Sequence, residues 1–286
     1  MSIHSSGAGR AEGEKAPTER PGGLCAYSSG MRVAKTTALL VLVALAGCRA
    51  RIPGIAGEAT IDGPPARVPR FLERPAIDGK LDEAVWQTAT VLGPFVDTGD
   101  GHAVRASHPV AATARIGWDE QRLYLGFVVA DGQPVAPFHR DDPDPHLWAS
   151  ASAVEIMLQP GDPGDNRDYY EIQVDTAGAV FDTHWDNYLV PLSGSPVARV
   201  FGHQDWSCAA ERAATVVPGR SYTIEMALPW AALARGRTPI PPRAGDVWRL
   251  NLYSFRDGQR LALGWSPIRG QGNFHRSSRF GRVRFE

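Results

Sequence analysis

Residues 111–130, AATARIGWDEQRLYLGFVVA, decide the fold class of this chain. The first half alternates in period two as far as Trp118, and polar residues 119–122 then turn the chain. An apolar run returns over residues 123–130. Two such runs joined by a short polar turn predict an antiparallel β-hairpin.

The same period of two recurs along most of the chain. It predicts further strands over residues 153–158, 169–175, 179–185, 206–217, 221–228, 246–256 and 280–285, and a short one ending at residue 265. Helical signals are confined to a turn after Asp82, which is placed to cap it, and a turn at 229–233 that begins with proline. The sequence therefore predicts an all-β, antiparallel, jelly-roll-like sandwich of about ten strands with one or two short helical turns.

The N-terminal part has the features of an export signal. Arg32 and Lys35 precede a short apolar run over residues 38–45, which is too short to span a membrane comfortably. The run ends in Leu-Ala-Gly-Cys48, which resembles the lipobox of bacterial lipoproteins and makes Cys48 the expected lipidation site. We expect a leader or mis-assigned start over 1–30, a signal peptide over 31–47, a flexible tether over 48–69 and the domain over 70–286.

This reading predicts an exported lipoprotein held in a membrane by its lipid. Arg49 follows the lipidated cysteine where an aspartate would favour retention in the inner membrane, so the outer membrane is the expected location, facing the periplasm or the cell surface.

Charge and cysteine content exclude several classes of protein. The chain carries 30 basic and 31 acidic residues without a basic patch, which argues against nucleic-acid binding. Of its three cysteines, Cys25 precedes the expected mature start and Cys48 would carry lipid, which leaves Cys208 alone. A disulfide framework or a cysteine metal site is therefore not expected within one chain.

Catalytic and metal-binding signals are weak. No nucleophile, phosphate-loop or zinc-protease motif occurs, and Glu155 and Glu171 are the one pair of strand carboxylates that could serve glycoside hydrolysis. Asp141, Asp142 and Asp144 form an oxygen-rich loop that could bind calcium, and the histidines show no close pair on one strand face. Met157 and Met226 lie in apolar strands and are interpreted as core residues rather than haem ligands.

Two stretches point to a binding site for a small ligand. Trp148 lies in a polar loop just before a strand, where an exposed indole can stack on the apolar face of a sugar. The C-terminal stretch from Gly264 to Phe285 contains a polar loop between two strands, with amides and a phenyl ring at the rim of the sheet.

The order of the motifs resembles carbohydrate-binding module family 9. The matching pieces are Ile77-Asp-Gly-x-Leu-Asp-Glu-x-Val-Trp86, Trp118-Asp-x-x-x-Leu-Tyr124, Ala153-Val-Glu-Ile156, Tyr169-Tyr-Glu-Ile-Gln-Val174, Tyr222-Thr-Ile-Glu-Met-Ala-Leu-Pro-Trp230, Gly245-Asp-Val-Trp-Arg-Leu-Asn251, and Trp265-Ser-Pro through Phe280-Gly. The resemblance implies a β-sandwich that holds sugar between two aromatic rings, with calcium in some members.

Carried over by position, the resemblance assigns the site residues. Trp148 and Phe274 would be the two rings, although sugar-binding members have Trp at the second position. The polar residues that would bind hydroxyl groups are Glu155, Glu171, Gln271 and Asn273. Ser150-Ala-Ser-Ala153 replaces the acidic residues often found before this strand, which weakens the case for calcium.

The sequence thus predicts a non-catalytic, lipid-anchored protein of the cell envelope that binds poly- or oligosaccharides. Two alternatives stay open. One is a structural or protein-binding envelope lipoprotein without a sugar ligand. The other is a glycoside hydrolase of carbohydrate catabolism that uses Glu155 and Glu171.

Overall fold

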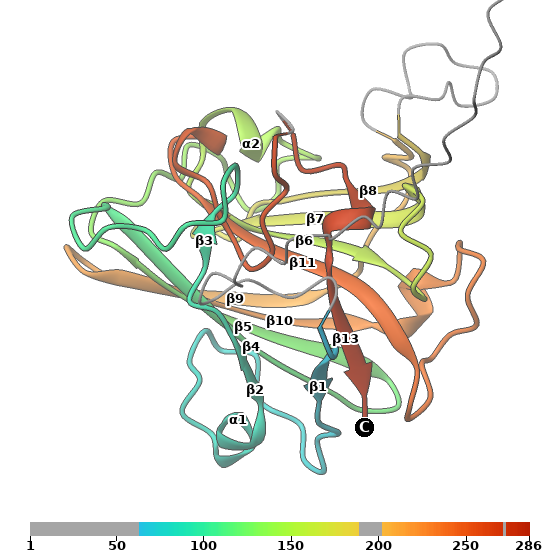
Figure 1. Ribbon diagram of the computed structural model, residues 1–286. Coiled ribbons are helices and arrows are strands. Elements are labelled where there is room, and N and C mark those ends of the chain that lie inside the picture. Colours follow the sequence, from blue (N-terminus) through green and yellow to red (C-terminus); the bar gives the residue numbers. More distant parts are fainter. Residues whose placement is uncertain (1–62, 189–201, 271–272) are drawn as a thin grey trace, which may run out of the picture. The chain divides into compact units, whose positions relative to one another are not determined.

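The computed structural model describes residues 63–188, 202–270 and 273–286, which form two packed β-sheets (Figure 1). Its elements are β1 (Ala66–Val68), α1 (Ala84–Thr88), β2 (Thr90–Leu92), β3 (Val96–Asp97), β4 (Val110–Trp118), β5 (Arg122–Asp131), α2 (Leu147–Ser150), β6 (Ala153–Gln159), β7 (Arg167–Asp175), β8 (Val180–Asn187), β9 (Glu211–Val217), β10 (Ser221–Pro229), η2 (Trp230–Leu233), β11 (Val247–Phe255), η3 (Gln259–Leu261), β12 (Leu263–Gly264), η4 (Ser277–Arg279) and β13 (Gly281–Phe285).

The larger sheet has eight strands and the smaller has five. The larger runs in the order β1-β13-β11-β6-β7-β8, with β12 and β3 attached beside β11, and the smaller runs β2-β4-β5-β10-β9. Among the named strands, all pairings are antiparallel except that of β1 with β13. The predicted all-β sandwich is confirmed, and the hairpin of residues 111–130 becomes β4 and β5.

The main core lies between the two sheets and follows from the period of two. In β6, Val154, Ile156 and Leu158 point into this core, where they meet apolar residues of β4, β5 and β10. Apolar burial stabilises such a core by roughly 25 cal/mol for each Å² removed from water.

The other face of the larger sheet is buried as well. The alternate residues of the same strands, such as Met157 and Tyr169, pack in a second cluster with Leu147 of α2 and with Phe274 and Phe280 of the closing segment. Figure 1 shows α2 and this red closing segment lying over β6, β7 and β11. In the larger sheet the period-two pattern therefore separates two buried faces, and not a buried face from a solvent-exposed one.

A third cluster seats the first helical turn on the outer face of the smaller sheet. Trp86 of α1 packs against Phe71 and Tyr124. Gly117 makes room for this cluster, since a Cβ atom there would lie 2.1 Å from Cε1 of Phe71. Trp86 is fully buried, but Asp82 is not the predicted N-cap: the helix begins after Glu83, which forms no side-chain capping bond.

Three short strands were not predicted. β1 lies inside the stretch interpreted as a tether, and its three residues are flanked by prolines. β2 and β3 have three and two residues, so neither shows a period. Strands of this length form because a neighbouring strand is available in the fold, which a local pattern cannot reveal. β9 also begins at Glu211 rather than at residue 206.

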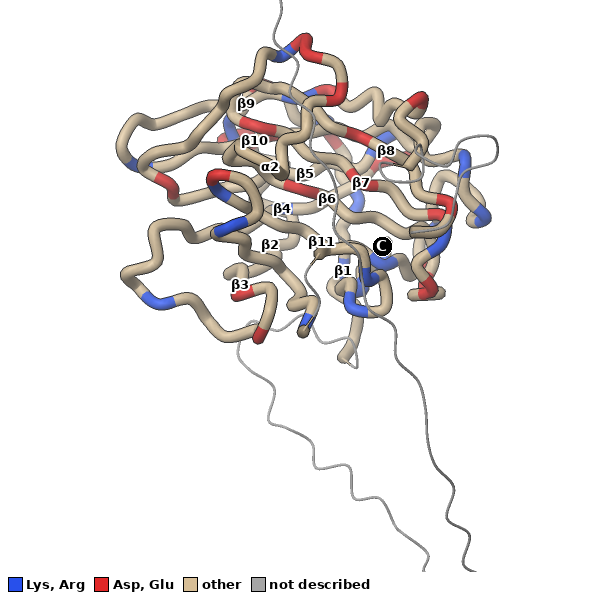
Figure 2. The backbone as a smooth tube through the Cα atoms, turned by 90° about the horizontal axis from the view of Figure 1, so that it is seen from above, with Lys and Arg blue, Asp and Glu red and all other residues tan. Residues whose placement is uncertain are grey.

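Charged residues are mixed over the described surface. Figure 2 shows acidic positions on several strands of both sheets and basic positions scattered mainly toward the rim, without a face of one sign. No helix among the described residues is long and apolar enough to cross a membrane.

Candidate functional site

A cleft opens above the second buried face of the larger sheet. It has a volume of about 180 Å³. Five of its lining residues are aromatic rings other than histidine, and the remainder offer a carboxyl group, two amides and an imidazole; the lining residues are Trp148, Glu171, Phe181, Trp185, Tyr188, Gln259, Asn273, Phe274 and His275. An apolar wall with a few convergent polar groups is typical of a small-ligand site.

Trp148 lies at this cleft, on the short helix α2. Its ring stacks on His146 at a centroid distance of 4.2 Å and meets the edge of Phe181 at 4.6 Å. Leu147, the preceding residue, is fully buried and anchors the helix on the sheet. The indole is therefore held in place yet remains half-exposed at the rim of the cleft.

Phe274 also lines the cleft, but its ring is only 6% exposed. It stacks on Tyr253 with a centroid distance of 4.0 Å and an interplanar angle of 6°. One face of the phenyl ring is thus covered by protein. Phe274 is a supporting part of the wall rather than a free stacking platform of the kind the sequence predicts.

Trp185 and Tyr188 are aromatic residues of the cleft that the sequence prediction missed. Trp185 extends from β8 and is 3% exposed, and Tyr188 stacks on His275 at 3.9 Å with an angle of 6°. The available signal was the period of β8, since Phe181 and Trp185 fall on the same face of that strand.

The carboxyl group of Glu171 forms the polar floor of the cleft. Trp185 Nε1 donates to Glu171 Oε2 at 2.9 Å, and Gln173 Nε2 donates to Glu171 Oε1 at 2.8 Å. These bonds fix the carboxyl group while it faces the cleft. Glu171, one of the site residues assigned from the sequence, thus lines this cleft.

Glu155 lies beneath the cleft and does not line it. Its side chain is fully buried, and its Oε2 atom accepts hydrogen bonds from Gln173 at 3.2 Å and Gln259 at 3.4 Å. The prediction that Glu155 binds hydroxyl groups directly is wrong for this arrangement, because Gln259 of η3 stands at the cleft in its place. Glu155 instead orients the two glutamines.

Burial raises the pKa of both carboxyl groups. The pKa of Glu171 rises to about 7, mainly because burial disfavours its charge, and the bonds from Trp185 and Gln173 offset part of this rise. The pKa of Glu155 is also raised, by burial and then by the charge of Glu171. Burial lowers the pKa of His275 to about 3. Although His275 Nε2 lies 3.8 Å from Glu171 Oε2, burial disfavours both charges, so this pair is uncharged between pH 5 and 6.

Glu171 is expected to make stability depend on pH. A carboxyl group with a folded pKa of about 7 and an unfolded pKa of 4.5 stabilises the fold fully below pH 4.5, and this contribution is lost as pH rises through 7. Urea unfolding from pH 5 to pH 8 should therefore show the native chain losing up to about 3 kcal/mol more than Glu171→Gln. Both proteins share Glu225, another buried carboxyl with a raised pKa, so its effect cancels, and the difference between them reports Glu171 together with its effect on the pKa of Glu155. If the unfolding free energies of the native chain and Glu171→Gln change equally between pH 5 and pH 8, this expectation is contradicted.

Asn273 is the described amide of the closing loop. It lines the cleft, its Nδ2 atom donates to Tyr188 Oη at 3.2 Å, and its Oδ1 atom accepts from the His275 backbone N–H at 3.1 Å. The loop is thereby tied to the aromatic wall. Gln271 and Cys48 lie outside the described residues.

The remaining predicted ligands of metals or haem do not join this cleft. Met157 is 1% exposed within the second cluster, as its interpretation as a core residue predicts. Asp141, Asp142 and Asp144 do not converge as a ligand set among the described residues. Asp142 Oδ2 instead accepts the His139 backbone N–H at 2.9 Å, an arrangement typical of a capped turn.

This chain is similar to several solved structures. A candidate carbohydrate-binding protein from Bacteroides uniformis ATCC 8492 matches 77% of this chain and 98% of its own, with 19% identity and a TM-score of 0.58. A family 9 carbohydrate-binding module from Caldicellulosiruptor kristjanssonii, in complex with cellotriose, matches 77% and 93% with 15% identity and a TM-score of 0.49. A structure of such a module from the same organism in complex with glucose matches 77% of this chain and 95% of its own, with 15% identity and a TM-score of 0.47.

Sequence comparison assigns the family. Comparison with curated proteins gives no significant match. The family profile described as "Carbohydrate family 9 binding domain-like" matches residues 77–286, which is most of the chain and includes the whole cleft and every named strand except β1. This chain therefore belongs to the carbohydrate family 9 binding domain-like family.

Proposed function

We propose that the domain binds carbohydrate without catalysis, in the cleft beside Trp148. The observation that carries this proposal is the cleft itself: a half-exposed indole at the rim, further rings behind it, and amide and carboxyl groups on the floor, in a member of a carbohydrate-binding family. The apolar face of a sugar ring packs on such an indole, and hydroxyl groups exchange hydrogen bonds with groups such as Glu171 and Asn273.

Hydrolysis is less well supported than binding. A glycosidase needs two carboxyl groups that both reach the scissile bond. Here Glu171 lines the cleft, whereas Glu155 is fully buried below it and bonded to glutamines. We therefore expect no release of reducing sugar from any glycan that binds.

A glycan array tests the proposed binding. The full chain should bind at least one class of poly- or oligosaccharide, and Glu171→Gln should weaken that binding because it changes the floor while keeping its shape. If the chain binds none of the glycans on the array, the proposal is contradicted and the alternative of a structural or protein-binding role is favoured. Release of reducing sugar that disappears in Glu171→Gln would favour the hydrolase.

The proposal includes a lipid anchor at Cys48. Its support is the order of basic residues, short apolar run and Leu-Ala-Gly-Cys48 in the sequence, and the lipid would hold the sugar-binding domain at the cell envelope. A labelled fatty acid should be incorporated into the native chain and not into Cys48→Ser, and the variant should leave the membrane fraction. Equal labelling of both proteins would contradict the anchor.

A further inference from the structure

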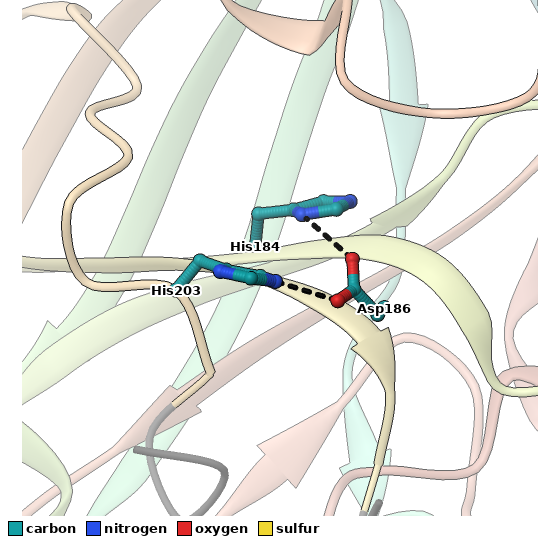
Figure 3. Close-up of side chains that lie close together, drawn as sticks. All are labelled: His184, Asp186 and His203. Carbon is teal, nitrogen blue, oxygen red and sulfur yellow. Dashed lines mark hydrogen bonds and ion pairs between the residues drawn. The ribbon is translucent and has the colours of Figure 1, made fainter. Parts of the chain in front are cut away.

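A second group of polar side chains lies at β8 and the segment that bridges to it, on the face of that strand opposite to the cleft. His184, Asp186 and His203 bring three ligating atoms within 4.8 Å of one another (Figure 3). His203 Nε2 lies 2.6 Å from Asp186 Oδ2, and His184 Nδ1 lies 3.7 Å from Asp186 Oδ1. The aspartate thus turns one oxygen toward each imidazole.

The backbone explains this convergence. His184 and Asp186 are two residues apart on β8, so they share one face of the strand. His203 forms an antiparallel bridge directly opposite His184, and its N–H donates to the His184 carbonyl at 2.9 Å. Directly paired residues place their side chains on the same face, about 5 Å apart at Cβ. The two imidazole rings accordingly stack at 5.6 Å.

The imidazole of His184 is buried without a hydrogen-bond partner. Its side chain is 3% exposed, and neither of its ring nitrogens has a hydrogen-bond partner. A buried polar group without a partner costs on the order of 1–3 kcal/mol, and most buried polar groups in proteins are satisfied. Figure 3 shows its Nδ1 side turned toward Asp186 and His203, where a bound ion would lie.

We propose that His184 Nδ1, Asp186 and His203 Nε2 bind a divalent transition metal ion, with Zn²⁺ as the best match. Two imidazoles and one carboxylate are ligands that Zn²⁺ accepts, and three protein ligands leave a fourth position for water. Two ligand atoms on a tetrahedral zinc ion lie roughly 3.4 Å apart. The separations of 2.6 Å and 3.7 Å bracket this value, and all three ligand atoms lie within 4.8 Å of one another, so side-chain rotations can bring them to one ion.

The surroundings provide an outer shell and a route for the ion. His203 Nδ1 lies 3.9 Å from Asp205 Oδ1, and Arg235 holds the Asp205 carboxylate with bonds of 3.0 and 3.3 Å. A carboxylate behind a ligating histidine orients the ring and strengthens the ligand. Asp186 and His203 are 55% and 28% exposed at their side chains, so the ion can enter from solvent.

The site would join two segments that are separated in sequence. The described residues stop at 188, just after β8, and resume at 202. His184 and Asp186 lie before this interval and His203 lies after it. A bound ion would therefore cross-link the edge of the larger sheet to the segment that follows. This role is independent of sugar binding, because Trp185, which faces the cleft, lies on the opposite face of β8.

The test is zinc binding by the full chain, prepared without a histidine tag and freed of metal by chelation. Calorimetric titration should show one Zn²⁺ per chain, and Zn²⁺ should raise the melting temperature. His203→Gln and Asp186→Asn should each weaken zinc binding at least about 100-fold, since they remove a ligand, and Asp205→Asn should weaken it about 10-fold or more. These side chains are partly exposed, so the variants avoid the packing defect that replacing buried His184 would cause.

His102→Gln is the matched control. His102 also stands beside an aspartate, with Nδ1 3.0 Å from Asp100 Oδ1, but that pair is exposed and has no third ligand atom within 4.8 Å among the described residues. The His102→Gln variant should bind zinc with the same affinity and stoichiometry as the native chain. Absence of stoichiometric zinc binding by the native chain would overturn the proposal and leave a hydrogen-bonded pair of Asp186 and His203. Equal loss, or equal retention, in His203→Gln and His102→Gln would overturn it as well.

Discussion

Replacing Trp148 by alanine is expected to weaken glycan binding about 30-fold while leaving the domain folded. The indole is one of the partly exposed rings that line the cleft, and aromatic anchors in a binding site contribute about 2 kcal/mol or more to binding. Each 1.4 kcal/mol corresponds to a factor of ten in Kd. Leu147 stays buried under α2, so the helix keeps its anchor on the sheet. Calorimetric titration with the best glycan from an array provides the measurement.

Two further variants make this experiment specific. Trp148→Phe keeps a smaller ring and should lose less affinity than the alanine variant. Leu72→Ala removes an apolar side chain that is 94% exposed and does not line the cleft, so its affinity should match that of the native chain. If Trp148→Ala keeps native affinity and a native circular dichroism spectrum, the sugar does not bind at this cleft.

Replacing Glu225 by glutamine is expected to cost about 3 kcal/mol of folding free energy. Glu225 is fully buried on the outer face of the smaller sheet and accepts three N–H bonds, each of 2.9 Å, from Trp86 Nε1 and from the backbone of Asp78 and Gly79. A glutamine has one oxygen, so its NH₂ group must face at least one of these donors. Buried donors without acceptors cost roughly 1–3 kcal/mol each.

Urea unfolding at pH 8 measures this loss, because the Glu225 pKa of about 7 leaves the carboxylate mostly charged there. Glu211→Gln on the neighbouring strand β9 is the matched control. Glu211 is 60% exposed and pairs with Arg122 at 2.8 Å, so its loss should cost less than about 1 kcal/mol. Equal effects of the two substitutions would show that the three bonds to Glu225 do not carry the expected stability.

The hydrogen bonds of Glu225 connect sequence motifs from which the β-sandwich was predicted. They tie the Ile77–Trp86 motif to the Tyr222–Trp230 motif, two of the pieces on which the family resemblance rests. The main strands could be found because their alternation is set by burial, which acts on each residue locally. The β4–β5 hairpin was found for the same reason, and so were the two strands that pair as β9 and β10.

The cleft was predictable only in part. Trp148 and Phe274 could be assigned by position, but the covering of Phe274 by Tyr253 depends on a side-chain contact between β11 and the closing loop. Glu155 and Glu171 could be recognised as a possible pair of strand carboxylates, yet only the fold shows that Gln259 stands between Glu155 and the cleft. Likewise, His184 and His203 meet through a bridge between segments 19 residues apart, which no local spacing reveals.

The pairing of β1 with β13 determines how mechanical load would enter the domain. A pull on the chain before Ala66 acts first on β1, which runs parallel to the last strand and is registered with it over Ala66–Val283, Arg67–Arg284 and Val68–Phe285. A force along β1 must shear these contacts together rather than peel them one by one. Figure 1 shows β1 and β13 side by side, with β13 leading to the C-terminus, so both ends of the folded domain share one load-bearing edge.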